Sequence, residues 1–404
     1  GQRTLLKVSK TERNSETLAA IATPLGEGGI GVIQVSGPHS LEIVGRLFKG
    51  KRVKDITKVP SGGLFYGTLE ACSEPFGSEL RAELHSESNS SGTVDEVVVN
   101  VWRAGDSPTG EDMVEVNCHG GIRAIRRTLE AILAAGAKEA RWPELLDQAL
   151  KKGRLDLIQK EALEALTQAK TRLCVKVLLW QYQGALSRAI STLEARVKAL
   201  EEGIGAPSEE THRGLSELLA GIERLLDSST FGLALTCPQK VTIAGVPNVG
   251  KSTLFNLLLR EERAIVHPEP GTTRDYVSEY LSIRGVPFEL VDSAGVRDAQ
   301  VQVEREGVER ARALHKQADK IILVLDNSRP LSQEERLLID ELDPKRVVPV
   351  INKIDLCRGT LRRAPGDLES YFLIPPVRLS ALHGQGLEAL ETALIKEFQE
   401  ELGR

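Results

Sequence analysis

The sequence predicts a multidomain α/β protein, in which an α+β unit, a helical segment and a second α/β unit follow one another along 404 residues. Three observations predict this class. An apolar strand, a glycine-rich loop and a run of helix formers occur in that order between Val241 and Leu259. Apolar residues recur at three- and four-residue steps over much of residues 142–227, as in packed helices. After Gln239, strand-like and helix-like segments alternate, which is typical of a largely parallel sheet.

Length and composition limit the class further. A chain of 404 residues is too long for one ordinary core, which favours two or three domains. The net charge of −5 gives no overall positive surface for binding nucleic acid. A local contact with nucleic acid could use the basic run at residues 49–54, and the alternative is that this run is a solvated loop. The five cysteines have no C-x-x-C spacing, which argues against a disulfide framework or a zinc site and fits a reducing compartment. No apolar run approaches the roughly 18 residues of a membrane helix, and we expect a soluble, cytoplasmic protein.

The first part of the chain reads as a compact α+β unit. Strand, tight loop and strand are predicted over residues 17–37, where a glycine-rich turn separates two apolar runs. Further strands are predicted at 63–69 and 95–101, followed by a helix at 122–135. Residues 73–93 are rich in Ser, Glu and Gly and are expected to form a loop.

Two amphipathic stretches predict long helices in the middle of the chain. Their apolar positions are Leu173, Val177, Trp180, Leu186, Ile190, Leu193, Val197 and Leu200 and, after a polar break, Leu215, Leu218, Leu219, Ile222, Leu225 and Leu226. A stripe of this kind is usually the core of a helix bundle, so we predict no ligand site from it. Residues 228–238 are expected to link these helices to the next strand.

The last part of the chain reads as alternating strands and helices. Strands are predicted at residues 240–244, 277–283, 287–291, 320–325, 347–351 and 377–379, and a single helix at 387–402. A largely parallel sheet with helices on both faces binds its ligands at the carboxyl ends of its strands.

The residues from Gly245 to Ser252 match the pattern G-x-x-x-x-G-K-[ST] of a phosphate loop. The glycines allow main-chain N–H groups to turn inward around phosphate oxygens, at the positive N-terminus of the following helix. Lys251 can reach the β- and γ-phosphates as a catalytic cation, and the Ser252 hydroxyl can ligate Mg²⁺. The alternative is a chance glycine-rich turn, which would not need strand, loop and helix in this order. The predicted nucleotide contacts here are Asn248, Val249, Gly250, Lys251, Ser252 and Thr253.

Three further stretches follow at predicted strand ends. Asp292-Ser293-Ala294-Gly295 can hold a Mg²⁺-bound water through its aspartate and sense the γ-phosphate through its glycine N–H. Asn352-Lys353-Ile354-Asp355 ends another strand, and Ser380-Ala381-Leu382 can approach a base oxygen through a main-chain N–H. Each is a weak motif alone. In this order after the phosphate loop, they predict a GTP-binding P-loop domain of the Ras-like type.

Asp355 predicts the choice of base. A carboxylate at this strand end can accept hydrogen bonds from both N1–H and the 2-amino group of guanine. Adenine offers neither group in that geometry and would leave a buried carboxylate unpaired. The sequence therefore predicts a preference for GTP over ATP.

The segment Gly271-Thr272-Thr273-Arg274-Asp275 is predicted to be a switch that places Thr273 on Mg²⁺. Many GTPases orient the attacking water with a Gln directly after the second glycine motif, but Val296 stands there and cannot form a hydrogen bond. Hydrolysis must use another group, either a monovalent cation or one of the charged residues that follow. The charged candidates are Arg297, Asp298, Glu304 and Arg305, for each of which a solvated helix start is the alternative.

These residues resemble the tRNA modification GTPase family (MnmE/TrmE), which acts on the wobble uridine. The resemblance covers nearly the whole chain. In the amino-terminal part it is carried by residues 17–24, by Thr109-Gly110-Glu111-Asp112 and by Cys118-His119-Gly120-Gly121. Residues 153–157 resemble the start of the family's helical domain, and the phosphate loop, the switch and residues 292–297 resemble its G domain.

The resemblance implies a G domain inserted in an α-helical domain, preceded by an α+β domain that binds tetrahydrofolate and forms a homodimer. The implied domains are residues 1–125 (folate binding and dimerisation), 126–236 (helical), 237–390 (G domain) and 391–404 (a helix returning to the helical domain). By matching position, Asn248 and Thr272 with His267 and Glu269 would hold K⁺, and Glu304 would steer the hydrolytic water. The resemblance further implies an FAD-dependent partner protein, and a 5-formyl- or methylene-tetrahydrofolate as one-carbon donor for uridine C5 in tRNA.

Several positions depart from the family pattern. Gln34 stands where an arginine is expected and Arg154 where a lysine is usual, while Glu115 is retained; these three are the candidate folate contacts. The printed chain ends soon after Ser380, without the family's Cys-x-Gly-Lys tail. The resemblance thus predicts a GTPase that acts in tRNA modification, and the alternative is a GTP-regulated dimeric scaffold that has lost the modification chemistry.

Overall fold

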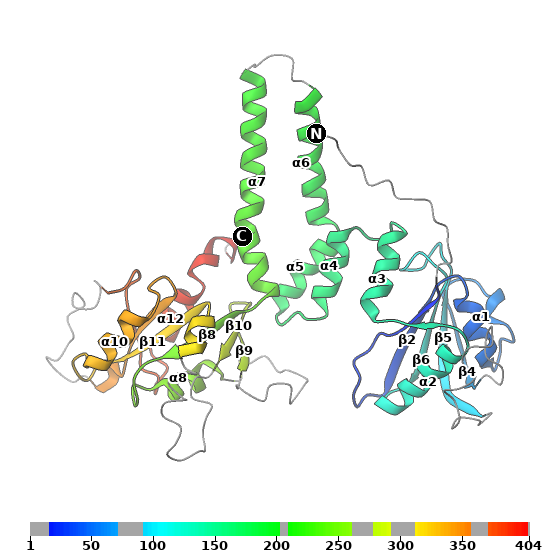
Figure 1. The fold of residues 1–404 in the computed structure, drawn as a ribbon, viewed down its shortest axis with the longest axis horizontal. Coiled ribbons are helices and arrows are strands. Elements are labelled where there is room, and N and C mark those ends of the chain that lie inside the picture. Colours follow the sequence, from blue (N-terminus) through cyan, green and yellow to red (C-terminus); the bar gives the residue numbers. More distant parts are fainter. Residues whose placement is uncertain are drawn as a thin grey trace. The chain divides into compact units, whose positions relative to one another are not determined.

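The computed structural model describes residues 16–71, 92–202, 209–260, 278–291, 312–356 and 371–402 (Figure 1). The chain divides into two compact units between Glu164 and Ala165. In the part of the chain that the structure describes, no helix is both long enough and apolar enough to cross a membrane. The units are described one after the other below.

The first unit contains a seven-stranded sheet in the order β3-β4-β5-β6-β2-β1-β7. Neighbouring strands are antiparallel, except for the parallel pair of β1 and β7. The strands are β1 (Leu18–Ile21), β2 (Ile30–Ser36), β3 (Phe48–Gly50), β4 (Gly63–Glu70), β5 (Thr93–Trp102), β6 (Met113–His119) and β7 (Lys138–Glu139). Strands β4 and β5 confirm the two predicted from their apolar pattern, whereas most of the loop expected at 73–93 lies outside the described residues.

The period of two along the strands gives this sheet two different faces. On β5, Val97, Val99 and Val101 are buried, and they share a core with helices α1 (Ser40–Leu47) and α2 (Ile122–Ala134). Val98 and Asn100 alternate with these valines and therefore lie on the opposite face, which carries the polar residues described below. The domain boundary expected at residue 125 falls within α2, whose apolar residues complete this core.

The helical segment comprises α3 (Trp142–Lys151), α4 (Leu157–Leu166), α5 (Arg172–Tyr182), α6 (Ala185–Glu202) and α7 (Glu209–Thr236). Helices α6 and α7 run side by side as a hairpin (Figure 1). Residues 228–236, which we expected to be a link, instead continue α7. The last turns of α7 remain helical because they bury Ala234 and Leu235, so packing extends the helix up to strand β8 (Gln239–Ala244).

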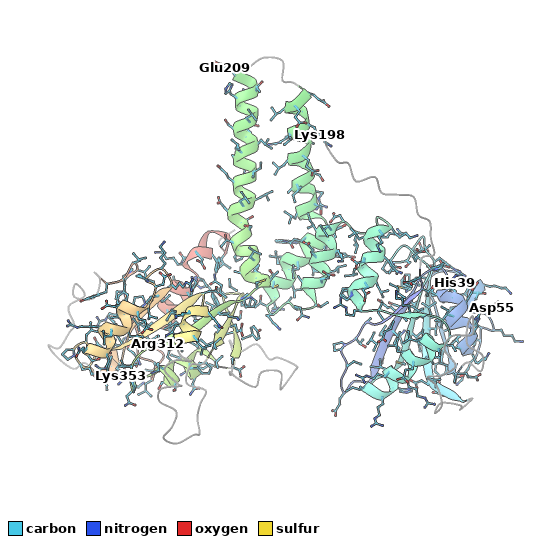
Figure 2. All side chains as sticks on the ribbon, viewed as in Figure 1. His39, Asp55, Lys198, Glu209, Arg312 and Lys353 are labelled. Carbon is cyan, nitrogen blue, oxygen red and sulfur yellow. The ribbon has the colours of Figure 1, made fainter. Side chains whose placement is uncertain are left out.

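The apolar stripe of these helices was predicted to be a bundle core, and for the described part of α6 this prediction was wrong. Helix α6 has no buried residue, and Ile190 and Val197 are 36% and 38% exposed. On α7, Leu219 and Leu226 are more open still, at 58% and 62% exposed, and many side chains of the hairpin project away from both helices (Figure 2). Two helices alone present only one narrow face to each other, which is too little to enclose a stripe of this width.

The second unit also contains a six-stranded sheet in the order β13-β12-β11-β8-β10-β9. Besides β8, its strands are β9 (Ser278–Ile283), β10 (Val286–Val291), β11 (Lys320–Asp326), β12 (Val347–Asn352) and β13 (Val377–Arg378). All pairs are parallel except β9 with β10, which form a hairpin. All six strands confirm the sequence prediction. The near-continuous burial of β8, β11 and β12 is typical of strands covered on both faces.

The helices that follow β8 include α8 (Lys251–Leu258), α10 (Gln333–Glu341), α12 (Leu387–Leu394) and α13 (Gln399–Leu402). The single helix expected at 387–402 is interrupted, because α12 ends at Leu394 and a short 3-10 turn, Lys396–Phe398, precedes α13. The break places Phe398, which is fully buried, beside Phe231 of α7, with ring centroids 5.9 Å apart. Burial of this ring compensates for the broken helix.

Candidate functional site

The phosphate loop joins β8 to α8 through unusual backbone conformations. Gly245 and Gly250 have φ of 150° and 102°, and Asn248 has φ of 63°, in the left-handed region that few side chains adopt. Lys251 Nζ donates hydrogen bonds of 2.8 and 2.9 Å to the main-chain oxygens of Gly245 and Val246. The ammonium group therefore lies over the loop, where it can reach phosphate oxygens held by the same main chain.

Asn352 connects the phosphate loop to the loop after β13. Its side chain is buried, its Nδ2 donates to the oxygen of Val249 at 2.8 Å, and its Oδ1 accepts from the N–H of Ala381 at 2.9 Å. A Cβ added at Gly250 would collide with Asn352 Nδ2. Gly250 is therefore needed both for its positive φ and for this close approach.

Asp355 and Ser380 form the part of the site that we predicted to recognise the base. Ser380 Oγ donates to Asp355 Oδ1 at 2.6 Å, which fixes the direction of the carboxylate. This hydrogen bond lowers the pKa of Asp355 below its usual value. The carboxylate is therefore ionised at neutral pH, as acceptance of two N–H groups from guanine requires.

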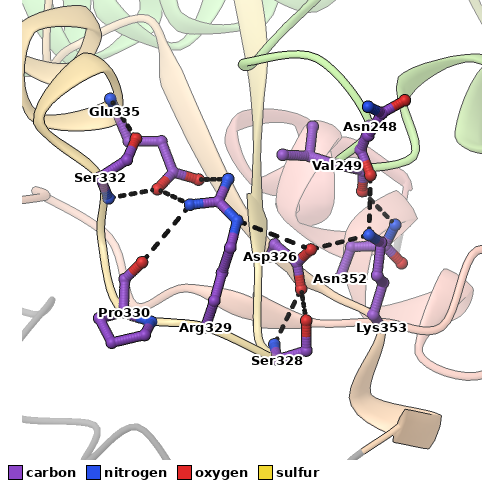
Figure 3. A network of polar contacts seen from close by, with 10 residues as sticks. All are labelled: Asn248, Val249, Asp326, Ser328, Arg329, Pro330, Ser332, Glu335, Asn352 and Lys353. Atoms are coloured by element: carbon purple, nitrogen blue, oxygen red, sulfur yellow. Dashed lines mark hydrogen bonds and ion pairs between the residues drawn. The ribbon is translucent and has the colours of Figure 1, made fainter.

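An ion pair that we did not predict lies between these two parts of the site (Figure 3). Lys353 Nζ donates to the oxygen of Asn248 and to Asp326 Oδ2, both at 2.7 Å. Asp326 is the last residue of β11 and is only 5% exposed. A signal for it was present in the sequence, because an aspartate directly after five apolar strand residues stands at a strand end, where ligand-binding residues of such sheets gather.

The folate candidates Gln34 and Glu115 lie together on the open face of the first sheet. They are register partners on β2 and β6, and Gln34 Nε2 donates to Glu115 Oε1 at 2.9 Å. Asn100 Nδ2 and Trp102 Nε1 donate to Glu115 Oε2 at 3.2 and 3.3 Å. Sequence reasoning missed these two donors, which only the pairing of β5 with β6 brings to the carboxylate.

The third folate candidate, Arg154, has main-chain partners. Its guanidinium donates to the oxygens of Ala104 and Gly105, in the connection between β5 and β6. The same connection holds Glu111, whose carboxylate pairs with Lys152 Nζ at 2.7 Å. The structure thus anchors Arg154 at the end of β5, and joins Gln34 to Glu115 by a direct hydrogen bond.

Several predicted residues lie outside the described residues. They are His267, Glu269, Gly271, Thr272 and Thr273 of the switch, Asp292, Ser293, Ala294 and Gly295 of the second glycine motif, and Val296, Arg297, Asp298, Glu304 and Arg305 after it. Of the remaining candidates, Ser252 and Thr253 are exposed on the first turn of α8, and Leu382 is 68% exposed beside Ala381. The described part of the site is therefore its phosphate-loop and base side.

Comparison with known proteins identifies the family. Residues 240–353 match the family model described as 50S ribosome-binding GTPase, and residues 17–154 match the one described as GTP-binding protein TrmE N-terminus. The tRNA modification GTPase MnmE of Carboxydothermus hydrogenoformans is 38% identical over 395 residues, which are 94% of this chain and 81% of that protein. This chain belongs to the tRNA modification GTPase MnmE family.

Other relatives give the same result. The family members of Geobacillus kaustophilus and Aquifex aeolicus are 39% and 38% identical, and in both the match covers 95% of this chain and 82% of the relative. The predicted resemblance, the multidomain fold with a P-loop G domain and the GTPase activity are confirmed, and this chain is a hydrolase that acts on GTP. A scaffold without the enzymatic function is not favoured by these relatives.

Proposed function

We propose that this chain binds GTP at the strand ends of its second sheet and couples GTP hydrolysis to modification of the wobble uridine in tRNA. The observation that carries the nucleotide site is the set of hydrogen bonds from Asn352, which join the phosphate loop to Ala381. Beside it, Ser380 aims the Asp355 carboxylate. Phosphate and base recognition thus belong to one connected structure, as selective binding of one nucleotide requires.

The residues present fit a triphosphate with its cations. Ser252 is exposed on the first turn of α8, and the Asn248 side chain is exposed on the loop while its main-chain oxygen accepts from Lys353. We propose that Ser252 and Thr273 hold Mg²⁺, and that Asn248, Thr272, His267 and Glu269 hold K⁺. These cations would neutralise charge on the phosphates. In the same proposal, Lys251 would bind the phosphates, Asp292 and Gly295 would contact the metal-bound water and the γ-phosphate, and Glu304 would orient the attacking water.

We propose that the open face of the first sheet binds a tetrahydrofolate derivative, either 5-formyl- or methylene-tetrahydrofolate. The support is Glu115, a carboxylate on an open face whose partners there are all neutral donors. A carboxylate is the acceptor that suits the adjacent amino and N–H groups of a pterin ring. Asn100 Oδ1 is buried without a hydrogen-bond partner, which leaves a second acceptor next to Glu115. Gln34 and Arg154 complete the proposed contacts.

The partners that we propose are a second copy of this chain, tRNA and an FAD-dependent protein, in the cytoplasm where tRNAs are modified. Support for the homodimer comes from apolar side chains on the open face of the first sheet, because Leu64, Tyr66 and Val98 are 69%, 44% and 37% exposed. Neighbouring apolar residues on one sheet face are typical of a surface that a protein partner covers. The proposed product is a uridine with a carboxymethylaminomethyl-type group at C5.

The base specificity tests the nucleotide site. In the Asp355→Asn variant an NH2 group, which donates, replaces one of the two carboxylate oxygens that would accept from the guanine N–H groups. GTP affinity should therefore fall by at least tenfold, or about 1.4 kcal/mol. Xanthosine triphosphate, whose 2-oxo group accepts from an amide, should bind this variant better than GTP does. Calorimetry on the full chain measures both affinities.

The matched control is Asp340→Asn, which removes the same charge from an exposed position on α10 and should leave GTP affinity unchanged. Parent protein that binds ATP as tightly as GTP would contradict the proposal.

For the modification itself, wobble-uridine analysis of a deletion strain should show loss of the C5 substituent, and an unchanged level would contradict the tRNA assignment.

A further inference from the structure

We propose that Asp326 is a positioning residue of the guanine-nucleotide site, which holds Lys353 against the phosphate loop and so fixes the distance between base recognition and phosphate recognition. This inference rests on the proposed nucleotide site. Asp326 lies outside all four sequence motifs of that site, so its role comes from the contacts in Figure 3.

The sheet topology explains why Asp326 can reach both sides of the site. Strand β11 lies between β8, which leads into the phosphate loop, and β12, which leads into Lys353. Asp326 and Asn352 are register partners at the carboxyl ends of their strands, and Asn327 N–H donates to the oxygen of Asn352 at 2.9 Å. Because parallel strands end at one edge of a sheet, the carboxylate lies between the two recognition loops.

Both carboxylate oxygens of Asp326 have defined partners, so the orientation of the group is fixed. Oδ1 accepts from the main-chain N–H and the hydroxyl of Ser328, at 2.8 and 2.6 Å. Oδ2 accepts from Lys353 Nζ at 2.7 Å. With its side chain only 7% exposed, Asp326 forms a charge-assisted hydrogen bond that solvent screens little.

Lys353 needs this support because of its backbone. It has φ of 62°, and the residue that it contacts, Asn248, has φ of 63°. Left-handed conformations of residues other than glycine persist only where the surrounding structure over-determines them. The hydrogen bond from Lys353 Nζ to the Asn248 oxygen joins these two positions, and Asp326 holds the ammonium group in place for it.

A second pair of charges supports Asp326 from the other side. Arg329 donates to both carboxylate oxygens of Glu335, at 3.0 and 3.1 Å, and its Nε lies 4.0 Å from Asp326 Oδ2. Glu335 is fully buried and caps α10 together with Ser332. Positive and negative groups therefore alternate from Lys353 to Asp326, Arg329 and Glu335, which stabilises the ionised carboxylate between two cations.

The Asp326→Asn variant tests the proposal in the full chain. It keeps the size of the side chain but removes the charge, so we expect GDP affinity by calorimetry to fall about tenfold, equivalent to 1.4 kcal/mol. GTP affinity should fall equally, because neither Asp326 nor Lys353 is among the residues proposed to contact the γ-phosphate, and kcat at saturating GTP should change by less than about twofold. Asp340→Asn is the control for a lost surface charge.

A double-mutant cycle with Lys353→Met separates positioning from a general structural role. If Asp326 acts through Lys353, Asp326→Asn should cause no further loss of GDP affinity in the Lys353→Met background. The same tenfold loss in both backgrounds, or no loss in the parent, would overturn the inference. Parent protein that fails to bind GDP at all would instead contradict the proposed nucleotide site.

Should Asp326→Asn not fold, Ser328→Ala provides a milder variant. It removes the hydroxyl donor from Asp326 Oδ1 and leaves the ion pair with Lys353 intact. A less constrained carboxylate should lower GDP affinity two- to threefold with an unchanged melting temperature. Unchanged GDP affinity in this variant would also overturn the inference.

Discussion

Two carboxylates, Glu115 in the first unit and Asp326 in the second, accept hydrogen bonds in contrasting ways. Glu115 lies on the open face of an antiparallel sheet and accepts from three neutral side chains, Gln34, Asn100 and Trp102. Asp326 lies at the end of a parallel strand, is almost inaccessible, and accepts from the cation of Lys353.

The contrast shows two roles for a carboxylate on a sheet. It can accept hydrogen bonds from a bound ligand, or it can form an ion pair that stabilises the protein itself. The three side chains that donate to Glu115 are neutral, so breaking their hydrogen bonds leaves no positive charge without a partner. A ligand can therefore replace them. Removing Asp326 from Lys353 would leave an uncompensated charge, which costs much more. We therefore interpret Glu115 as a ligand-binding group and Asp326 as a residue that holds the nucleotide site in position.

The largest expected effect concerns the backbone at Gly250. Gly250→Ala places a methyl group against Asn352 and forces an alanine to φ of 102°, so GTP affinity should fall 10- to 100-fold, in line with about 1–3 kcal/mol of strain. Gly62→Ala is the matched control, because Gly62 has φ of 81° but nothing within 4 Å of an added Cβ. Calorimetric GTP titrations should distinguish the two, and equal affinities would contradict the role of Asn352.

The next effect tests whether Glu115 is a ligand group. Glu115→Ala leaves three side-chain donors without their acceptor, so the first unit should lose about 1–3 kcal/mol in its free energy of unfolding. Binding of 5-formyltetrahydrofolate should fall with it, while GTP affinity stays unchanged. Glu130→Gln, an exposed change on α2, is the control. Folate binding that survives Glu115→Ala would show that this face is not the folate site.

Gln34→Arg would sharpen the comparison by placing a cation beside Glu115, as Lys353 is placed beside Asp326. A charged donor contributes roughly 1 kcal/mol more than a neutral one, so 5-formyltetrahydrofolate should bind about fivefold more tightly. Fluorescence or calorimetric titration measures this change. Weaker binding in the variant would mean that the new arginine pairs with Glu115 instead of the ligand.

The smallest effect is a difference in pH dependence between the units. In the first, the hydrogen bond with Asp95 raises the pKa of His119 above 6.5, so its contribution to stability is complete below 6.5 and is lost as pH rises through the raised value. In the second, burial alone would raise the pKa of Asp326, but hydrogen bonds from Lys353 and Ser328 outweigh it and lower the pKa. That contribution is present above 3.8 and is lost as pH falls through the lowered value.

NMR titration can follow these groups directly. The His119 ring should titrate above 6.5, and Asp95→Asn should bring its pKa back toward that value. The Asp326 carboxylate, whose pKa is lowered, should show no change between pH 6 and 8. A His119 pKa that Asp95→Asn leaves unaltered would show that the 2.6 Å contact is not maintained in solution.

The sequence predicted the second sheet better than the sites on it. Buried parallel strands such as β8, β11 and β12 leave near-continuous apolar runs, and all six strands of this sheet were predicted. The phosphate loop, Asn352 and Asp355 were predicted because each belongs to a short motif with fixed spacing. Asp326 was missed because its position at a strand end is a weak signal on its own, and its partner Lys353 is 27 positions away in the sequence.

The helices were predicted less well, for a physical reason. A helical period shows which side of a helix is apolar but not whether anything covers it, and α6 leaves Ile190 and Val197 open. The end of α7 and the break after α12 depend on which apolar residues find a buried position, such as Leu235 and Phe398. Likewise, the donors of Glu115 come from strands paired across the sheet, and single-sequence patterns do not reveal that pairing.

The register between Asp326 and Asn352 has a consequence for how this domain tolerates insertions. Side chains on a strand point alternately to opposite faces, so one extra residue within β11 would turn the carboxylate away from Lys353. An extra residue after Pro344, in the exposed turn between α10 and β12, would leave that direction unchanged. Strand length, more than loop length, therefore constrains variation around the nucleotide.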